Sequence, residues 1–104
     1  MATTISPEQA RKRLANLEGW QLEGNAIVRQ FTFRDFPEAV AFVVRLGFSA
    51  EAADHHPDIL INYKRVRLTY STHSAGGLTE KDFAGAEEAG RLAAAFERPR
   101  SPSE

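Results

Sequence analysis

The stretch DILINYKRVRLTYST, residues 58–72, decides how this chain is expected to fold. In its second half, Val66, Leu68 and Tyr70 alternate with polar residues, which is the two-residue period of a strand with one buried face. The first half is also largely apolar. The stretch therefore predicts an antiparallel hairpin with two strands, Asp58 to Tyr63 and Val66 to Thr72.

A second hairpin is predicted upstream of the first. Trp20 to Leu22 has the character of a short strand, and Glu23-Gly24-Asn25 supplies residues that favour a turn. In the segment that follows, Ala26 to Arg34, three apolar side chains fall on one face and are expected to point into a core. These three are Ile27, Phe31 and Phe33.

Cap residues mark the starts of three helices. Ser6-Pro7-Glu8 combines an N-cap, a proline at the first helical position and an early acid, and Gly19 is expected to end this helix. Asp35-Phe36-Pro37-Glu38 and Thr79-x-x-Asp82 both have the spacing of a capping box. In that arrangement the cap side chain and the acid side chain each accept a hydrogen bond from the other residue's backbone N–H.

The second helix is predicted to be apolar on more than one side. Its expected buried stripe contains Val40, Val43, Leu46, Gly47 and Ala50, whereas Phe42 and Val44 lie off that stripe. A chain of 104 residues buries only roughly 60–65% of its unfolded surface. A helix with two apolar sides in so small a protein therefore suggests a contact between subunits.

The predicted element order is α-β-β-α-β-β-α. Two hairpins with intervening helices give an α+β fold, in which a four-stranded antiparallel sheet is covered by helices on one face. The length fits one domain, residues 1–98, and the Pro/Ser-rich residues 99–104 are expected to form a disordered tail.

Composition excludes several classes of protein. The chain has no cysteine, so disulfides, thiolate zinc sites and a cysteine nucleophile are ruled out. A formal net charge of −1 argues against a protein that binds nucleic acid. We expect a cytoplasmic protein, because the first residues lack the apolar segment of a secretory signal and the longest apolar run, residues 39–44, is too short to span a membrane.

All three histidines lie between positions 55 and 73. His55 and His56 follow the second helix, and His73 follows the last strand. A hairpin around Lys64-Arg65 pairs residues whose numbers sum to about 129, which places position 56 opposite position 73. Histidine exchanges a proton near neutral pH, so converging imidazoles could share the acid and base roles of a catalyst.

The same residues also have simpler interpretations. A single histidine is more often structural than catalytic, although clustering favours a site, and adjacent histidines lack the i,i+4 spacing of two metal ligands on one helix face. We therefore expect no metal. Glu51 lies one helical turn before His55 and would share its face. Asp82 is also explained as the N3 residue of a helix capped by Thr79, and Trp20 is explained most simply as a core residue.

Several segments combine into one recognisable pattern. They are Glu51-Ala-Ala-Asp-His55-His56-Pro57, Ser71-Thr72-His73, Gly77-Leu78-Thr79-Glu80-x-Asp82, Gly19-Trp20 and Phe31-x-Phe33-x-Asp35-Phe36. This pattern closely resembles the signature of the pterin-4a-carbinolamine dehydratase family, and the similarity covers nearly the whole chain. One departure is Ile59, because many relatives carry an aromatic residue two positions after the proline.

The resemblance implies a carbon–oxygen lyase, 4a-hydroxytetrahydrobiopterin dehydratase. Such an enzyme dehydrates 4a-hydroxytetrahydrobiopterin, the pterin-4a-carbinolamine, to quinonoid dihydropterin without a metal or an organic cofactor. The resemblance also implies homodimers or homotetramers and a functional link to an aromatic amino acid hydroxylase, whose tetrahydrobiopterin would be recycled. By motif match, the catalytic positions are His55, His56 and His73, and the substrate-binding positions are Asp82, Glu51 and Trp20.

Two other functions compete with this one. Animal members of the family also act as dimerisation cofactors for a homeodomain transcription factor, and some bacterial relatives resemble assembly chaperones with eroded active sites. The complete set of histidines favours the enzyme, because a scaffold has no physical need for converging imidazoles. A small metal-dependent hydrolase is the second alternative.

Overall fold

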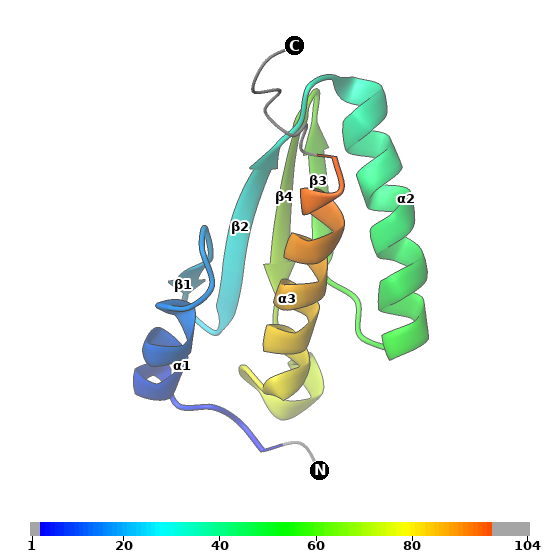
Figure 1. Cartoon of the computed structure of the whole chain (residues 1–104). Helices are drawn as coiled ribbons and strands as arrows, with labels where there is room; N and C mark the ends of the chain where they lie inside the picture. The colour runs from blue at the N-terminus through cyan, green and yellow to red at the C-terminus, as the bar shows by residue number, and fades with distance from the viewer. Residues whose placement is uncertain (1–2, 97–104) are drawn as a thin grey trace.

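A computed structural model describes residues 3–96, which form three α-helices and one four-stranded antiparallel sheet (Figure 1). In chain order the elements are α1 (Pro7–Leu14), β1 (Gln21–Glu23), β2 (Ala26–Thr32), α2 (Phe36–Ala53), β3 (Asp58–Asn62), β4 (Arg65–Tyr70), a short 3-10 helix (His73–Ala75) and α3 (Glu80–Ala94). The predicted α+β order is confirmed. The tail predicted at 99–104 lies outside the described residues.

The two hairpins meet in the middle of the sheet. The strand order is β1-β2-β4-β3, so β2 pairs with β4 and β3 lies at an edge. Helices α2 and α3 lie across the same face of the sheet (Figure 1). That face is lined by the apolar side chains that the alternating pattern predicts, among them Ile27, Phe31, Val66 and Leu68, all of which are buried.

The register of the β3–β4 hairpin differs from the predicted one. Asn62 pairs with Arg65 and Asp58 pairs with Thr69, so the paired numbers sum to 127. The turn therefore consists of Tyr63 and Lys64, and Tyr63 has a φ of 57°, a left-handed conformation that tyrosine rarely adopts. Extending this register would place position 56 opposite position 71, so the predicted pairing of position 56 with position 73 is wrong.

The helix starts follow the cap predictions, but one capping box is only half formed. The Asp35 side chain accepts a hydrogen bond from the Glu38 N–H at 2.9 Å. The Glu38 carboxylate, however, accepts from the N–H of Arg34 at 2.8 Å instead of returning the bond to the cap residue. Helix α1 ends at Leu14, before Gly19, because the chain continues from there in tighter turns with i→i+3 hydrogen bonds.

The buried face of α2 also corrects the predicted stripe. The fully buried or nearly buried residues of this helix are Ala39, Phe42, Leu46 and Ala50. Phe42 packs against Phe31 and Phe33, with ring centroids 5.1 and 4.9 Å away. Because an aromatic side chain contributes a large apolar area, it sets which side of the helix faces the sheet. The prediction that Phe42 lies off the buried stripe is therefore wrong, and Gly47, predicted to be on it, is exposed.

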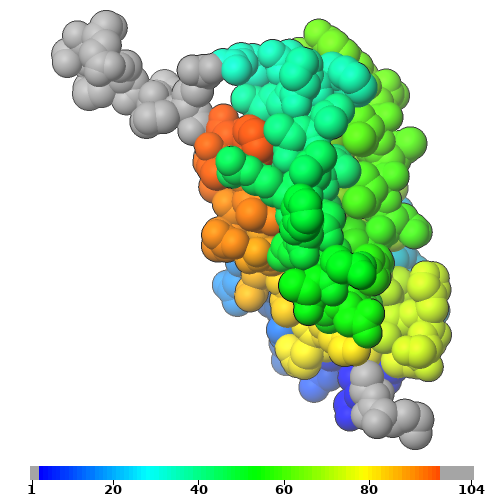
Figure 2. All heavy atoms as spheres, turned by 90° about the vertical axis from the view of Figure 1, so that its right-hand side faces the viewer, coloured from blue at the N-terminus to red at the C-terminus, as the bar shows by residue number. Residues whose placement is uncertain are grey.

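The opposite side of α2 is apolar as well, as the sequence predicts. Phe36, Val44 and Phe48 have exposed fractions of 49%, 54% and 77%. These positions are spaced four or eight residues apart, so they share one side of the helix. Figure 2 views the molecule from the side on which α2 crosses the surface, with β3 beside it.

Candidate functional site

The turn that ends α2 sets the direction of the two adjacent histidines. Asp54 is left-handed, with φ 54° and ψ 42°. Its N–H donates to the Glu51 carbonyl and the His55 N–H donates to the Ala50 carbonyl, both at 3.1 Å. These are the two hydrogen bonds of a Schellman motif, in which glycine is the usual left-handed residue. The backbone of His55 is thereby tied to the last turn of α2.

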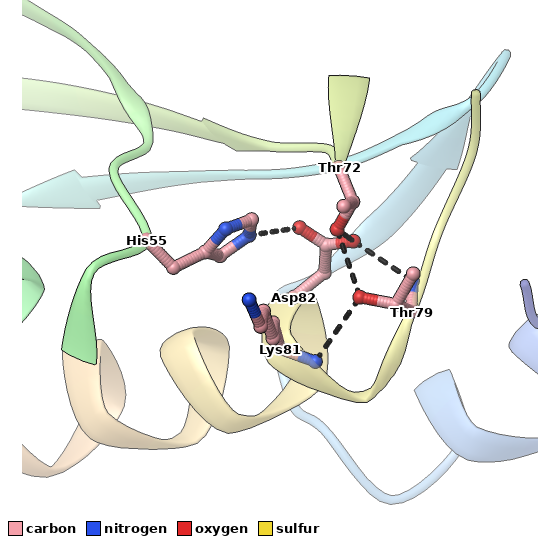
Figure 3. A network of polar contacts seen from close by, with 5 residues as sticks. All are labelled: His55, Thr72, Thr79, Lys81 and Asp82. Carbon is pink, nitrogen blue, oxygen red and sulfur yellow. Dashed lines mark hydrogen bonds and ion pairs between the residues drawn. The ribbon is translucent and has the colours of Figure 1, made fainter. Parts of the chain in front are cut away.

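Asp82, in the first turn of α3, is the centre of a buried polar network (Figure 3). Its side chain has no exposed surface. Oδ2 accepts hydrogen bonds from the Thr79 N–H at 2.9 Å and from the Thr72 hydroxyl at 2.8 Å. Oδ1 lies 2.6 Å from Nε2 of His55. The predicted capping role of Asp82 is confirmed, and the same carboxylate also contacts a histidine.

The donors and acceptors of this network determine which His55 nitrogen carries a proton. The Thr79 hydroxyl lies 2.8 Å from the Thr72 hydroxyl and accepts from the Lys81 N–H at 3.3 Å. Since the single proton of Thr72 goes to Asp82, Thr79 must donate to Thr72. An ionised carboxylate only accepts, so with Asp82 as the carboxylate the Nε2 atom of His55 is the donor of this contact. In that tautomer Nδ1 of His55 is an acceptor, and it takes part in no hydrogen bond within residues 3–96.

His56 forms a separate pair with Glu51. Its Nε2 atom lies 2.8 Å from Oε1 of Glu51, and both side chains are exposed, at 56% and 81%. The prediction that Glu51 shares a helix face with His55 is wrong, because α2 ends at Ala53 and the left-handed Asp54 turns the chain before His55. Two acid–histidine pairs therefore lie next to each other in the chain, one buried and one exposed to solvent.

His73 is the first residue of the 3-10 helix, and its side chain is exposed. Within residues 3–96, its ring takes part in neither a hydrogen bond nor an ion pair. Its neighbour Thr72 belongs to the Asp82 network, so the backbone of His73 lies next to the buried part of the site. That all three imidazoles share one cleft stays a prediction.

Aromatic rings connect this site to the core. Trp20 is 5% exposed and lies 5.9 Å from the ring of Tyr70, so its simpler interpretation as a core residue agrees with the structure. Tyr70 in turn stacks on His55, with ring centroids 6.0 Å apart and an angle of 22° between the planes. Burial raises the pKa of Tyr70 to about 12, assisted by the negative charges of Asp82 and Glu88.

A cavity of about 300 Å³ opens beside His55 and Tyr70. It lies between α2 and α3, where small residues leave space: Ala50, Ala53, Ala84 and Gly85. Its polar lining residues include Lys81 and Glu88 as well as His55. Hydrogen bonds from Arg91 and Ser49 lower the pKa of Glu88.

Thr72 and Tyr70 are site residues that sequence reasoning missed. The alternating pattern predicts that Tyr70 is buried, but not that its ring meets His55. Thr72 belongs to the motif Ser71-Thr72-His73. The signal in the sequence that could have identified Thr72 is its hydroxyl next to the candidate catalytic residue His73.

Within residues 3–96, clusters of metal-binding side chains and membrane-spanning helices are both absent. In that part of the chain, no three His, Cys, Asp or Glu side chains gather as they would to hold a metal ion. The helices there include none with the length and apolar character to cross a membrane.

The sequence matches the model of a protein family over residues 3–92, and that family is described as pterin 4 alpha carbinolamine dehydratase. The chain belongs to the pterin-4-alpha-carbinolamine dehydratase family. The matched range includes the whole Asp82 network, both acid–histidine pairs and His73. The resemblance drawn from the sequence is thereby confirmed.

Curated relatives carry the name of the same family. A protein of Roseiflexus sp. (strain RS-1), provisionally named a pterin-4-alpha-carbinolamine dehydratase, is 52% identical over 83 residues, covering 80% of this chain and 89% of the relative. One of Chloroflexus aurantiacus, with the same provisional name, is 56% identical over 80 residues, covering 77% and 86%.

Two solved structures have folds similar to that of this chain. The crystal structure of a transcriptional coactivator/pterin dehydratase from Brucella melitensis matches with a TM-score of 0.83 and 36% identity, covering 88% of this chain and 99% of that one. A pterin dehydratase-like protein, identified as a RuBisCO assembly factor in the alpha-carboxysome, matches with a TM-score of 0.59 and 24% identity, covering 71% and 86%. The second match bears on the fold alone.

Proposed function

We propose that this protein is a 4a-hydroxytetrahydrobiopterin dehydratase that removes water from a pterin-4a-carbinolamine by histidine acid–base catalysis. The observation that carries the proposal is the 2.6 Å contact between His55 and the fully buried Asp82, in a member of this family. A buried carboxylate that fixes one ring nitrogen leaves the other available to exchange a proton with a substrate.

The reaction needs one proton removed and one proton supplied. As the C4a–O bond breaks, the leaving oxygen takes a proton and departs as water, while N5 loses its proton and its electron pair forms the C4a=N5 double bond. In the proposed mechanism, Nδ1 of His55 accepts the N5 proton and Asp82 stabilises the resulting imidazolium. His73 protonates the leaving oxygen and His56 positions the pterin. Asp82, which has no exposed surface, acts on the substrate through His55. General acid–base catalysis of this kind contributes roughly 10²–10⁴-fold, or about 3–5 kcal/mol of the barrier.

The experiment measures dehydration of a chemically generated carbinolamine by stopped-flow absorbance. We expect His55→Ala, His56→Ala and His73→Ala to lower turnover to different extents, and the triple variant to lose the catalysed rate. Gln30→Ala, an exposed change on the opposite face of the sheet, serves as the control. Near-normal turnover by the triple variant would end the proposal.

A non-catalytic binding role is the second candidate. The observation in its favour is that the RuBisCO assembly factor named above shares this fold. A pterin-binding assay beside the dehydration assay separates the two functions, because a scaffold would bind a partner protein without catalysing turnover. The network around Asp82 favours the enzyme, because the cap of α3 uses only Oδ2 of the carboxylate, whereas Oδ1 contacts an imidazole, which a scaffold does not need.

We also propose that the chain forms homodimers or homotetramers. The supporting observation is the exposed apolar side of α2, with Phe48 77% exposed, together with Leu60, 60% exposed on the edge strand β3. Large exposed apolar groups on neighbouring elements are typical of an interface between subunits. Sedimentation of the wild type and of Phe48→Ser tests this, and we expect the variant to dissociate at higher concentration. A cytoplasmic location and a link to an aromatic amino acid hydroxylase stay predictions.

A further inference from the structure

The hydrogen bond to Asp82 does not by itself fix the plane of the His55 ring. A single contact at Nε2 holds one atom of the imidazole, and rotation about the Cβ–Cγ bond, which moves Nε2 only slightly, can still turn the plane of the ring. His55 lies in the segment between α2 and β3, and one side of it faces the 300 Å³ cavity. Something else must therefore hold the ring in the orientation that presents Nδ1 to a substrate.

The ring of Tyr70 lies nearly parallel to that of His55 in an offset stack. The two planes are 22° from parallel, with centroids 6.0 Å apart. Tyr70 is held by the end of β4 and is 2% exposed. Trp20 supports it from another direction, with centroids 5.9 Å apart. A stacked neighbour that is itself fixed in the core removes the rotation that the hydrogen bond allows.

Gly85 is the residue that makes room for Tyr70. A Cβ atom on Gly85 would lie 2.5 Å from Cε1 and 2.7 Å from Cζ of Tyr70, closer than real Cβ contacts allow. Glycine inside a helix carries a cost relative to alanine, so its presence in α3 needs a reason. The close approach of the tyrosine ring supplies that reason.

We propose that Tyr70 is a positioning residue for the dehydration, and that its ring fixes the plane of the His55 imidazole. The ring has room there because Gly85 has no side chain. The inference rests on the proposed function, because it concerns the histidine that acts there as the base. The hydroxyl of Tyr70 makes no hydrogen bond within residues 3–96, so the ring and not the hydroxyl carries this role.

Three variants test the proposal against one control. Tyr70→Leu removes the ring, Tyr70→Phe restores it without the hydroxyl, and Gly85→Ala displaces it. The control is Gly90→Ala on the same helix, where a Cβ would lie 3.6 Å from the Arg29 side chain, an ordinary contact. Turnover of chemically generated carbinolamine gives kcat and KM, and crystal structures of the variants give the plane of the His55 ring.

Misplacement of a catalytic group by a fraction of an ångström to one ångström lowers the rate by roughly ten- to a hundredfold. We expect Tyr70→Leu and Gly85→Ala to lower kcat by that factor with KM within about twofold of the wild type, because substrate contacts are retained. Crystal structures of these two variants should show the His55 ring turned about its Cβ–Cγ bond, or in more than one orientation. Tyr70→Phe should recover most of the turnover that leucine loses.

The result that would overturn the proposal is a folded Tyr70→Leu or Gly85→Ala protein with unchanged kcat and an unchanged plane of the His55 ring. If Tyr70→Leu does not fold, Gly85→Ala decides, because alanine itself favours a helix. A wild type without dehydratase activity would end the proposed function. The crystal structures of the variants would still decide whether Tyr70 orients His55, so the two failures can be told apart.

Discussion

The Nε2 atom of His55 lies 2.6 Å from Oδ1 of Asp82, and that carboxylate also caps α3 through its other oxygen. One buried group thus serves the fold and the proposed chemistry together. Its substitution is expected to affect both, and the two effects can be measured separately.

Asp82→Asn keeps the shape of the side chain but replaces an acceptor oxygen with an NH₂ group. If the NH₂ group replaces Oδ2, the Thr79 N–H and the Thr72 hydroxyl lose their acceptor. If it replaces Oδ1, His55 faces a donor in place of an acceptor. We expect unfolding free energy to fall by about 1–3 kcal/mol, as urea denaturation would measure, and kcat to fall by roughly 10²-fold. A variant of normal activity would contradict the role given to this carboxylate.

Thr72→Val removes the hydroxyl that donates to Asp82 and leaves the side chain nearly the same size. The loss of a buried partner is expected to cost about 1–3 kcal/mol and to lower kcat with little change in KM. The control is Thr69→Val on the preceding strand β4, a half-buried threonine outside the Asp82 network, which should change stability by less than about 0.5 kcal/mol. Equal losses in the two variants would show that the Thr72 hydroxyl has no special role.

Alkaline pH is expected to destabilise the fold through Tyr70. Its pKa is raised to about 12 in the folded protein, above that of an unfolded tyrosine, so the neutral phenol stabilises the folded state. This stabilisation is complete below about pH 10 and is lost as the pH rises towards 12, at about 1.4 kcal/mol per pKa unit of difference. In urea titrations at several pH values, Tyr70→Phe should lose part of this alkaline decline. Tyr63→Phe, which changes a 60% exposed residue, should keep it.

Asp54 is in a left-handed conformation that glycine adopts at a lower cost. We expect Asp54→Gly to raise the unfolding free energy by up to about 1 kcal/mol, measured as a higher urea midpoint. Gly76 is also left-handed, with a φ of 73°, and has open space where a Cβ would lie. We expect Gly76→Ala to lower the unfolding free energy by about 1 kcal/mol. If Asp54→Gly is destabilising, the aspartate side chain must make a contribution beyond the turn.

Local patterns predict much of this fold, because they act over a few residues. The alternation in β4 and the cap sequences before α2 and α3 each indicate the right element. The register of the β3–β4 hairpin could not be predicted, because Tyr63 carries no signal of a left-handed turn. The sequence also could not show that Glu51 would pair with His56, since that depends on the left-handed turn at Asp54.

The site was predicted in part for the same physical reason. His55 and Asp82 are found together, as the motif implies, but the chain gives no local sign that Thr72 joins them or that Tyr70 stacks on His55. Such contacts depend on how α3 docks against the end of β4. A sequence pattern identifies which residue types are present, and packing decides which of them meet.

The dual use of Asp82 has a consequence for how the protein responds to heat. Helix ends fray before a domain melts, and opening of the first turn at Thr79 would release the carboxylate from His55 while the sheet is still intact. Thermal inactivation should therefore begin several degrees below the calorimetric transition and be reversible on cooling. Amide hydrogen exchange at Thr79 and Asp82 would follow the same temperature course as the loss of turnover.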